Sequence, residues 1–205
     1  MQNYFFRRKL FSVFLTLACL AAAVPVCAAG SAQSAQTFVQ MLGRQWIDIM
    51  NGTTSLSEKK TQMRPFLDRA VDVDDVARYC LGTYWRIATP GQRLRYLGLF
   101  HAIFTNSITE RLGDYSRITF TIGRASAFGE DMAVETVITR PNQPGAKVLW
   151  IVKQANGDPK VVDMIAEGVS LRLTERQDYV SFIERNNGNI DILLQTLARQ
   201  LARHG

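Results

Sequence analysis

An acidic cluster near the middle of the chain, Asp72-Val73-Asp74-Asp75, has a spacing that suggests chemistry. The pattern D-x-D-D is used by terpene cyclases to protonate polyenes, and closely spaced carboxylates can also bind a metal ion. The chain of 205 residues is far too short for such a cyclase. Two acids three residues apart, directly before an apolar-periodic segment, are typical of a helix N-terminus. We therefore predict that Asp72 caps a helix.

The other candidates for acid–base chemistry are His101, Asp163 and Glu167. His101 is the only histidine apart from His204 and lies on the apolar face of a predicted helix, so we expect a satisfied core or pocket histidine. The sequence has no G-x-S-x-G, H-E-x-x-H, P-loop or C-x-x-C motif that would supply a nucleophile or a metal site. A carboxylate in an apolar cavity can act as a base, but a surface or capping role is the simpler interpretation of both acids. No catalytic residue, metal site or cofactor is predicted.

The N-terminal segment 1–29 has the composition of a secretory signal peptide. Arg7, Arg8 and Lys9 precede an apolar stretch over 10–24, and small residues follow at 25–29. The apolar stretch is shorter than the roughly 20 residues that a spanning helix needs. We expect cleavage after Ala28 or Ala29 and export across a bacterial inner membrane; a retained N-terminal anchor is the alternative.

The remaining residues, 30–205, are expected to form one domain. Cys19 and Cys27 would leave with the signal peptide, so Cys80 alone remains and cannot form an internal disulfide. Cleavage of the signal peptide would remove three basic residues and no acidic residue, and would lower the formal net charge from +6 to +3. The other basic residues are spread along the chain, which argues against nucleic acid as a partner.

Helical periodicity runs from residue 35 to residue 112. Pro65 disturbs the second predicted helix. Gly82 directly follows the third predicted helix, where a glycine commonly ends a helix. The clearest helix start is that of the fourth predicted helix, at Thr89-Pro90-Gly91-Gln92. It combines a capping threonine, a proline at the first helical position and a glutamine three residues after the cap. The predicted helices cover residues 38–50, 57–67, 73–81 and 90–112.

From residue 117 the apolar period changes to two, which predicts strands. Short loops, including Asn156-Gly157, favour an antiparallel meander. Thr174 and Asn189 are predicted to cap two C-terminal helices, so the chain is expected to be an α+β domain. Residues 133–138 and 148–152 are apolar on both faces, so helices cover both sides of the sheet or a ligand lies against one. The predicted strands cover residues 117–122, 132–140, 146–154 and 160–166.

Two segments resemble the signature stretches of MlaC-type proteins, the toluene-tolerance family. They are L-G-T-Y-W-R-I-A-T-P-G-Q-R at 81–93 and D-M-I-A-E-G-V-S-L at 163–171, and the resemblance spans about residues 36–203. It implies a twisted four-stranded antiparallel sheet wrapped by helices that lie on both sides of it in the sequence. It also implies an apolar cavity between the sheet and the helices that takes the acyl chains of a lipid.

The resemblance further implies a periplasmic phospholipid carrier without enzymatic activity. Such a protein shuttles lipid between an outer-membrane lipoprotein–porin complex and an inner-membrane ABC transporter, and so maintains outer-membrane lipid asymmetry. Phospholipid would be its cargo, and we expect a monomer. The alternatives are a carrier of hopanoid or another polycyclic lipid, an adaptor of a transport complex that carries nothing, and an enzyme with Asp163 or Glu167 as its base.

The residues expected to contact lipid are the apolar ones in or near the segments where the resemblance places the cavity. They are Trp46, Met50, Tyr84, Trp85, Leu97, Phe100, Phe104, Ile108, Leu112, Tyr115, Phe120, Ile122, Val137, Leu149, Ile151, Met164 and Val169.

Overall fold

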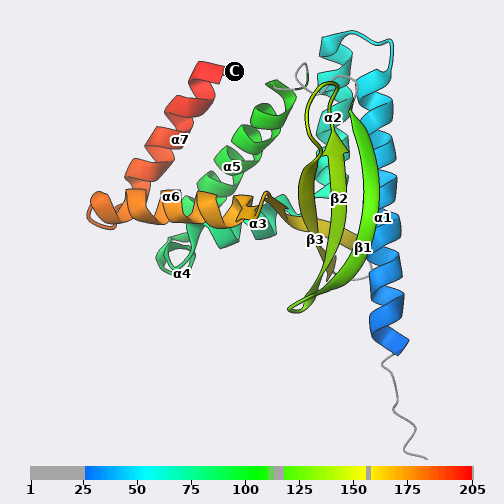
Figure 1. Cartoon of the computed structure of the whole chain (residues 1–205). Coiled ribbons are helices and arrows are strands. Elements are labelled where there is room, and N and C mark those ends of the chain that lie inside the picture. Colours follow the sequence, from blue (N-terminus) through cyan, green and yellow to red (C-terminus); the bar gives the residue numbers. More distant parts are fainter. Residues whose placement is uncertain (1–25, 111, 113–117, 156–157, 205) are drawn as a thin grey trace, which may run out of the picture.

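The computed structural model describes residues 26–110, 112, 118–155 and 158–204, and for residues 26–30, 155 and 204 it describes the backbone alone. Helices precede and follow one antiparallel sheet (Figure 1), so the predicted α+β class is confirmed. The helices are α1 (Val26–Asn51), α2 (Leu56–Ala70), α3 (Val73–Leu81), α4 (Tyr84–Ile87), α5 (Pro90–Glu110), α6 (Leu171–Arg185) and α7 (Ile190–His204). The strands are β1 (Thr119–Phe128), β2 (Asp131–Thr139), β3 (Ala146–Ala155), β4 (Asp158–Ala166) and β5 (Val169–Ser170).

The strands follow one another across the sheet in chain order, each antiparallel to the next. This is the predicted meander with one strand added. The two residues of β5 pair with Ile165 and Ala166 across a tight turn, in which Glu167 and Gly168 have φ angles of 49° and 82°. Positive φ at both central residues is typical of a type I′ hairpin, which usually carries Asn-Gly or Asp-Gly. Because Glu-Gly replaces them here, the sequence does not indicate this hairpin.

One face of the sheet packs against α1 and α2. We call the sheet, these two helices and the second half of α5 the sheet lobe. Phe38, Val39 and Leu42 recur at helical spacing on α1 and are buried. They belong to one core with Val134 and Val152 of the sheet. Full burial of a large apolar side chain stabilises a fold by about 1.5–3 kcal/mol, so this face holds α1 against the strands.

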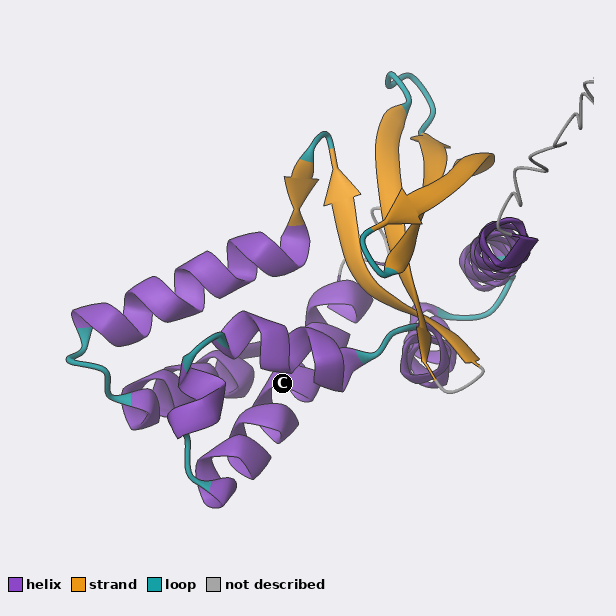
Figure 2. Cartoon of the chain, turned by 90° about the horizontal axis from the view of Figure 1, so that it is seen from below, coloured by secondary structure: helices purple, strands orange, loops and turns teal. Residues whose placement is uncertain are grey.

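The remaining helices, α3, α4, α6, α7 and the first half of α5, form a second core that we call the helical lobe. Tyr96 is fully buried in it and donates a hydrogen bond from its hydroxyl to the carbonyl of Ala77 (3.0 Å). Figure 2 shows this bundle beside the sheet. Phe104 of α5 and Val71 pack against both cores, so they mark where the two lobes meet.

The helix starts predicted from capping residues are largely confirmed. The backbone N–H of Asp75 donates to Asp72 Oδ1 (3.0 Å), as expected for a capping aspartate. At the start of α5, Thr89 N–H donates to Gln92 Oε1 (3.0 Å), and Gln92 N–H donates to Thr89 Oγ1 (3.2 Å). These reciprocal bonds satisfy backbone donors that the helix leaves unpaired.

One predicted start is wrong, because α6 begins at Leu171 and not after Thr174. Its cap is Ser170, whose hydroxyl accepts from the N–H of Leu173 (3.1 Å). The first turn of α6 leaves Leu171 and Leu173 exposed. Because that turn has no buried apolar side, the apolar periodicity of the sequence does not indicate where α6 begins.

Other helix limits also differ from the prediction, and the largest difference is at α1, which begins at Val26 and not at residue 38. Helix α2 continues past Pro65 to Ala70, because Phe66, Leu67 and Ala70 are buried beyond the proline. That burial outweighs the backbone hydrogen bond that proline removes. Helix α5 ends at Glu110, so Leu112 lies beyond the helix, although it remains fully buried.

Parts of the predicted N-terminal and loop features lie outside the described residues. Helix α1 includes residues 26–29 of the predicted signal peptide, whereas residues 1–25 and the Asn156-Gly157 turn are not described. The signal peptide and the single domain over 30–205 therefore stay predictions. No helix in the described part of the chain is both long enough and apolar enough to cross a membrane.

Candidate functional site

Seven large apolar side chains pack on the core of the sheet lobe while remaining only partly buried, and we call them the apolar lining. They are Trp46 and Ile49 of α1, Phe104 and Ile108 of α5, Phe120 and Ile122 of β1, and Trp150 of β3. Large apolar side chains inside a core are usually fully buried. The lining is therefore an apolar surface, built by two helices and the sheet, that a hydrocarbon chain can cover.

Aromatic contacts hold several of these rings in fixed orientations. The rings of Phe120 and Trp150 meet edge to face with centroids 6.3 Å apart. Trp46 makes a similar contact with Phe66 of α2 at 6.0 Å. Each such pair stabilises by about 0.5–1.5 kcal/mol beyond its buried area, so the lining keeps its shape by its own contacts.

The polar atoms next to the lining are paired inside the sheet. The indole Nε1 of Trp150 donates to Thr136 Oγ1 (2.9 Å), and that hydroxyl donates to the carbonyl of Val148 (3.1 Å). Thr136 is only 2% exposed. The indole and the threonine hydroxyl therefore already have partners, which suits hydrophobic contact with a ligand more than hydrogen-bond recognition.

Sheet register decides which predicted residues belong to this surface. Successive residues of a strand point to opposite faces. Leu149 and Ile151 flank Trp150, and Val137 follows Thr136, so all three point away from the lining. The strands are apolar on both faces, which is why the sequence did not distinguish the two.

The other predicted contact residues fall into several places. Trp46, Phe104, Ile108, Phe120 and Ile122 are in the lining, and Met50 and Leu112 are buried in the same core. Tyr84, Trp85, Leu97 and Phe100 belong to the helical lobe. Met164 pairs with Trp150 across β3 and β4 and is half-buried, Val169 is exposed on β5, and Tyr115 lies outside the described residues. The seventeen lipid contacts stay a prediction.

Two lining residues were missing from that prediction. Ile49 follows Trp46 at helical spacing, and that spacing was the available signal. The prediction included Leu149 and Ile151 but not Trp150, which lies between them. A tryptophan alternating with Val148 and Val152 was the sequence signal for the face that turns to α1.

Asp163 is buried, not on the surface, and its oxygens are occupied. Oδ1 accepts from the N–H groups of Met164 (2.8 Å) and Arg172 (3.1 Å). Oδ2 accepts from Ser170 Oγ (2.6 Å) and lies 3.6 Å from the guanidinium Nε of Arg172. Asp163 pairs with Ile151 and so lies on the sheet face opposite the lining. The capping interpretation is correct, because the carboxylate binds an N–H in the first turn of α6.

The other proposed acid–base groups also have structural partners. Glu167 is exposed, and its Oε1 accepts from the backbone N–H of Lys147 (3.0 Å). His101 is not in the core: its side chain is 42% exposed, and Nε2 lies 2.8 Å from Asp74 Oδ1. Among the described residues, no group of three or more His, Cys, Asp or Glu side chains could hold a metal ion.

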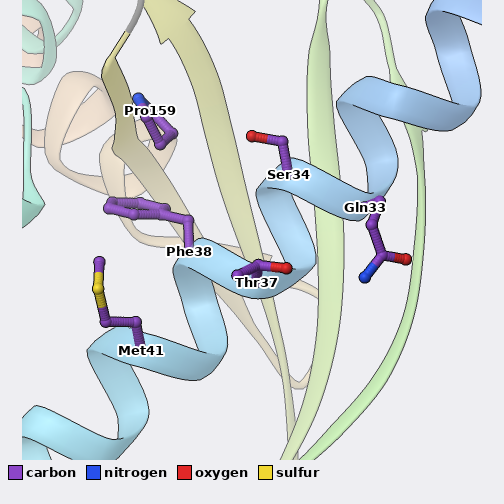
Figure 3. Close-up of a pocket in the computed structure, with 6 residues that line it drawn as sticks. All are labelled: Gln33, Ser34, Thr37, Phe38, Met41 and Pro159. Carbon is purple, nitrogen blue, oxygen red and sulfur yellow. The ribbon is translucent and has the colours of Figure 1, made fainter.

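A shallow hollow of about 490 Å³ lies on the outer surface, where α1 passes the start of β4. Figure 3 shows Phe38 and Met41 near Pro159, with Gln33, Ser34 and Thr37 along the helix. The hollow is open to solvent and shares no residue with the apolar lining. Its residues were not among those predicted to contact a ligand.

The sequence matches the model of the MlaC protein family over residues 40–199. The chain belongs to the MlaC family. A phospholipid-binding protein from Ralstonia solanacearum, solved in complex with a phospholipid, is similar in structure with a TM-score of 0.68. The two chains are 18% identical, and the match covers 84% of this chain and 97% of that one. The α+β fold expected from the signature segments is therefore confirmed, whereas the apolar cavity between sheet and helices stays a prediction.

In this MlaC-family chain, the two signature segments lie away from the apolar lining. Residues 81–93 contain the end of α3, α4 and the start of α5 in the helical lobe. Residues 163–171 form the β4–β5 hairpin and the start of α6, where Asp163 binds both ends of the turn. The two signature segments thus build the helical lobe and the hairpin, and the lining comes from other parts of the chain.

Proposed function

We propose that this protein is a periplasmic phospholipid carrier that holds acyl chains against the apolar lining. It would exchange lipid with an outer-membrane lipoprotein–porin complex and an inner-membrane ABC transporter, and so maintain outer-membrane lipid asymmetry. The half-buried apolar surface formed by Trp46, Phe104, Ile108 and Phe120 is the observation that carries the proposal. Membership of the MlaC family and the similar fold of the lipid-bound Ralstonia protein support it.

Hydrophobic transfer energies suit a carrier. Each buried methylene contributes about 0.8 kcal/mol, so two chains of ~15 carbons gain on the order of 20 kcal/mol relative to water. Extraction from a bilayer costs nearly the same amount. Net transfer from membrane to protein is therefore close to neutral, and partner proteins must supply the direction of transport.

Native mass spectrometry of protein purified from a bacterial periplasm, followed by lipid extraction, tests the proposal. We expect a discrete added mass that corresponds to a diacyl phospholipid. An added mass that corresponds to a hopanoid would mean that the cargo is a hopanoid and not a phospholipid. Protein that is free of lipid and cannot load from phospholipid vesicles would rule the carrier out.

A variant with a blocked lining localises the site. Ile108→Trp adds bulk at the lining and should lower the fraction of lipid-bound protein at least severalfold. Ser107→Trp is the matched control, because Ser107 is the neighbouring residue of α5 and is exposed. If both variants keep the wild-type lipid content, the lining is not the site. If Ile108→Trp loses lipid but supports transport in cells, the protein is an adaptor.

A further inference from the structure

The corner between α4 and α5 exposes two large apolar side chains. Leu94 is 76% exposed and Ile87 is 71% exposed, more than any other large apolar residue in the described part of the chain. Figure 1 shows α4 below α6, at the lower edge of the helical lobe and far from α1. This corner is therefore remote from the apolar lining, and its exposed side chains need a separate explanation.

The same corner has an unbalanced positive charge. Residues 76–109 contain Arg78, Arg86, Arg93 and Arg95 but no aspartate or glutamate. One carboxylate reaches the corner from α7, where Asp191 Oδ2 accepts from Gln92 Nε2 (3.0 Å). Arg78 pairs with Asp74 of α3 (3.3 Å). For the other three arginines, no salt bridge forms with any carboxylate that the structure describes. The charges of Arg86 and Arg95 are thus available to an external anion.

Hydrogen bonds fix the backbone of the corner. Arg93 donates from Nε to the carbonyl of Trp85 and from Nη2 to the carbonyl of Arg86, both at 2.9 Å. Its guanidinium lies 5.3 Å from the centre of the Trp85 ring. Ala88 is only 4% exposed and anchors the turn in the helical core. The exposure of Ile87 on this anchored turn is therefore a property of the fold and not of a loose segment.

We propose that the α4–α5 corner docks the protein on the surface of an anionic bilayer. Ile87 and Leu94 would enter the interfacial region, and Arg86 and Arg95 would face lipid phosphates. Apolar tips surrounded by basic residues are typical of interfacial segments, and anionic headgroups supply the complementary charge. This contact does not require a bound cargo lipid, so it stands independently of the proposed carrier function.

A bilayer fits the corner better than a protein partner does. A stable protein interface usually buries about 800 Å² on each side around a packed apolar centre. The corner offers two apolar side chains on a short helix and the adjoining turn of α5, at the edge of the molecule. Those features suit shallow insertion with electrostatic attraction.

Vesicle flotation with the full chain tests the proposal. The probes are phosphatidylcholine vesicles with and without about one third phosphatidylglycerol, at low salt and at about 0.5 M salt. We expect binding to the anionic vesicles alone, and its loss at high salt. Arg86→Gln with Arg95→Gln should weaken binding roughly 25-fold, about fivefold for each arginine. Ile87→Ser with Leu94→Ser should also weaken it.

Matched controls separate the corner from general effects. Arg44→Gln with Arg203→Gln makes the same change in net charge at exposed positions of α1 and α7. Leu56→Ser with Phe128→Ser removes two apolar side chains that are 52% and 44% exposed elsewhere. Both controls should bind vesicles as the wild type does. Native mass spectrometry of every variant reports cargo separately, so failure of docking and failure of the carrier function are distinguishable.

Two outcomes would overturn the proposal. One is a wild-type protein that does not bind anionic vesicles at low salt. The other is vesicle binding by the corner variants that equals that of the controls. If those variants instead lose binding to an inner-membrane transporter complex, the corner belongs to an acidic protein partner.

Discussion

The ring of Phe120 lies directly against the backbone of Gly43. A Cβ at position 43 would be 2.5 Å from both Cδ1 and Cε1 of that ring, closer than real Cβ contacts allow. The absence of a side chain therefore lets α1 cross β1 at short range. Because Phe120 belongs to the apolar lining, the residue at position 43 determines where that ring lies.

Gly43→Ala should displace the Phe120 ring and destabilise the protein by about 1–3 kcal/mol, as overpacking does in cores. Lipid retention should fall with it. Urea unfolding and native mass spectrometry measure the two effects. Gly98→Ala is the control, because a Cβ there would meet no atom within 4 Å outside the local backbone of its own helix, and alanine favours the helix by about 0.5–1 kcal/mol. Equal stability of the two variants would contradict the close contact.

Asp163→Asn should destabilise the protein by about 2–4 kcal/mol, since it removes the charge from a buried carboxylate bound by Ser170 and Arg172. The midpoint of urea unfolding measures this effect. Asp158→Asn is the control, because Asp158 is exposed and its replacement should change stability by less than about 0.5 kcal/mol. A small effect for Asp163→Asn would mean that the hairpin does not depend on this carboxylate.

The thiol of Cys80 should be unreactive in the folded protein. Burial is the main reason that the pKa of Cys80 rises to about 12, with smaller contributions from Glu175 and Asp163. The thiolate is the reactive form, so at pH 8 only on the order of 10⁻⁴ of the thiol is reactive. A chain with Cys19→Ser and Cys27→Ser should react with a thiol reagent in guanidinium and not in buffer. Rapid labelling in buffer would show that the third helix opens.

Asp131 should make stability depend on pH in the acid range. Burial raises the pKa of its carboxyl above the ordinary value, and Arg172 and Lys153 partly offset the rise. A raised folded-state pKa means that the folded protein binds the proton more tightly than the unfolded chain. The charged Asp131 carboxylate therefore destabilises the fold at pH values above its folded-state pKa. This destabilisation disappears as pH falls below the pKa of the unfolded chain, near 3.9.

Asp131→Asn should accordingly stabilise the protein at pH 7 and have no such effect at pH 3. Chemical unfolding at the two pH values measures the difference. Glu130→Gln is the control at the neighbouring exposed position. A stabilisation by Asp131→Asn that is equal at both pH values would show that the carboxyl charge is not its cause.

Local signals predicted much of the fold. Thr89 with Gln92 and Asp72 with Asp75 make their cap bonds within three residues of chain, so sequence spacing alone indicates them. The start of α6 was mispredicted although the Ser170 cap bond is just as local, because the first turn of α6 leaves Leu171 and Leu173 exposed and so has no apolar side. Apolar periodicity does not show a helix start of that kind.

The sequence by itself determined the α+β class, the order of the strands and the family, because capping residues, apolar periods and signature segments act over short stretches of chain. Only the tertiary structure decided which face of the sheet forms the apolar lining. Leu149, Trp150 and Ile151 are adjacent and apolar, and the packing of α1 on one face assigns Trp150 to the lining and its neighbours to the opposite side. Pairing register and helix packing are non-local, so the position of the candidate site emerges only when the chain is folded.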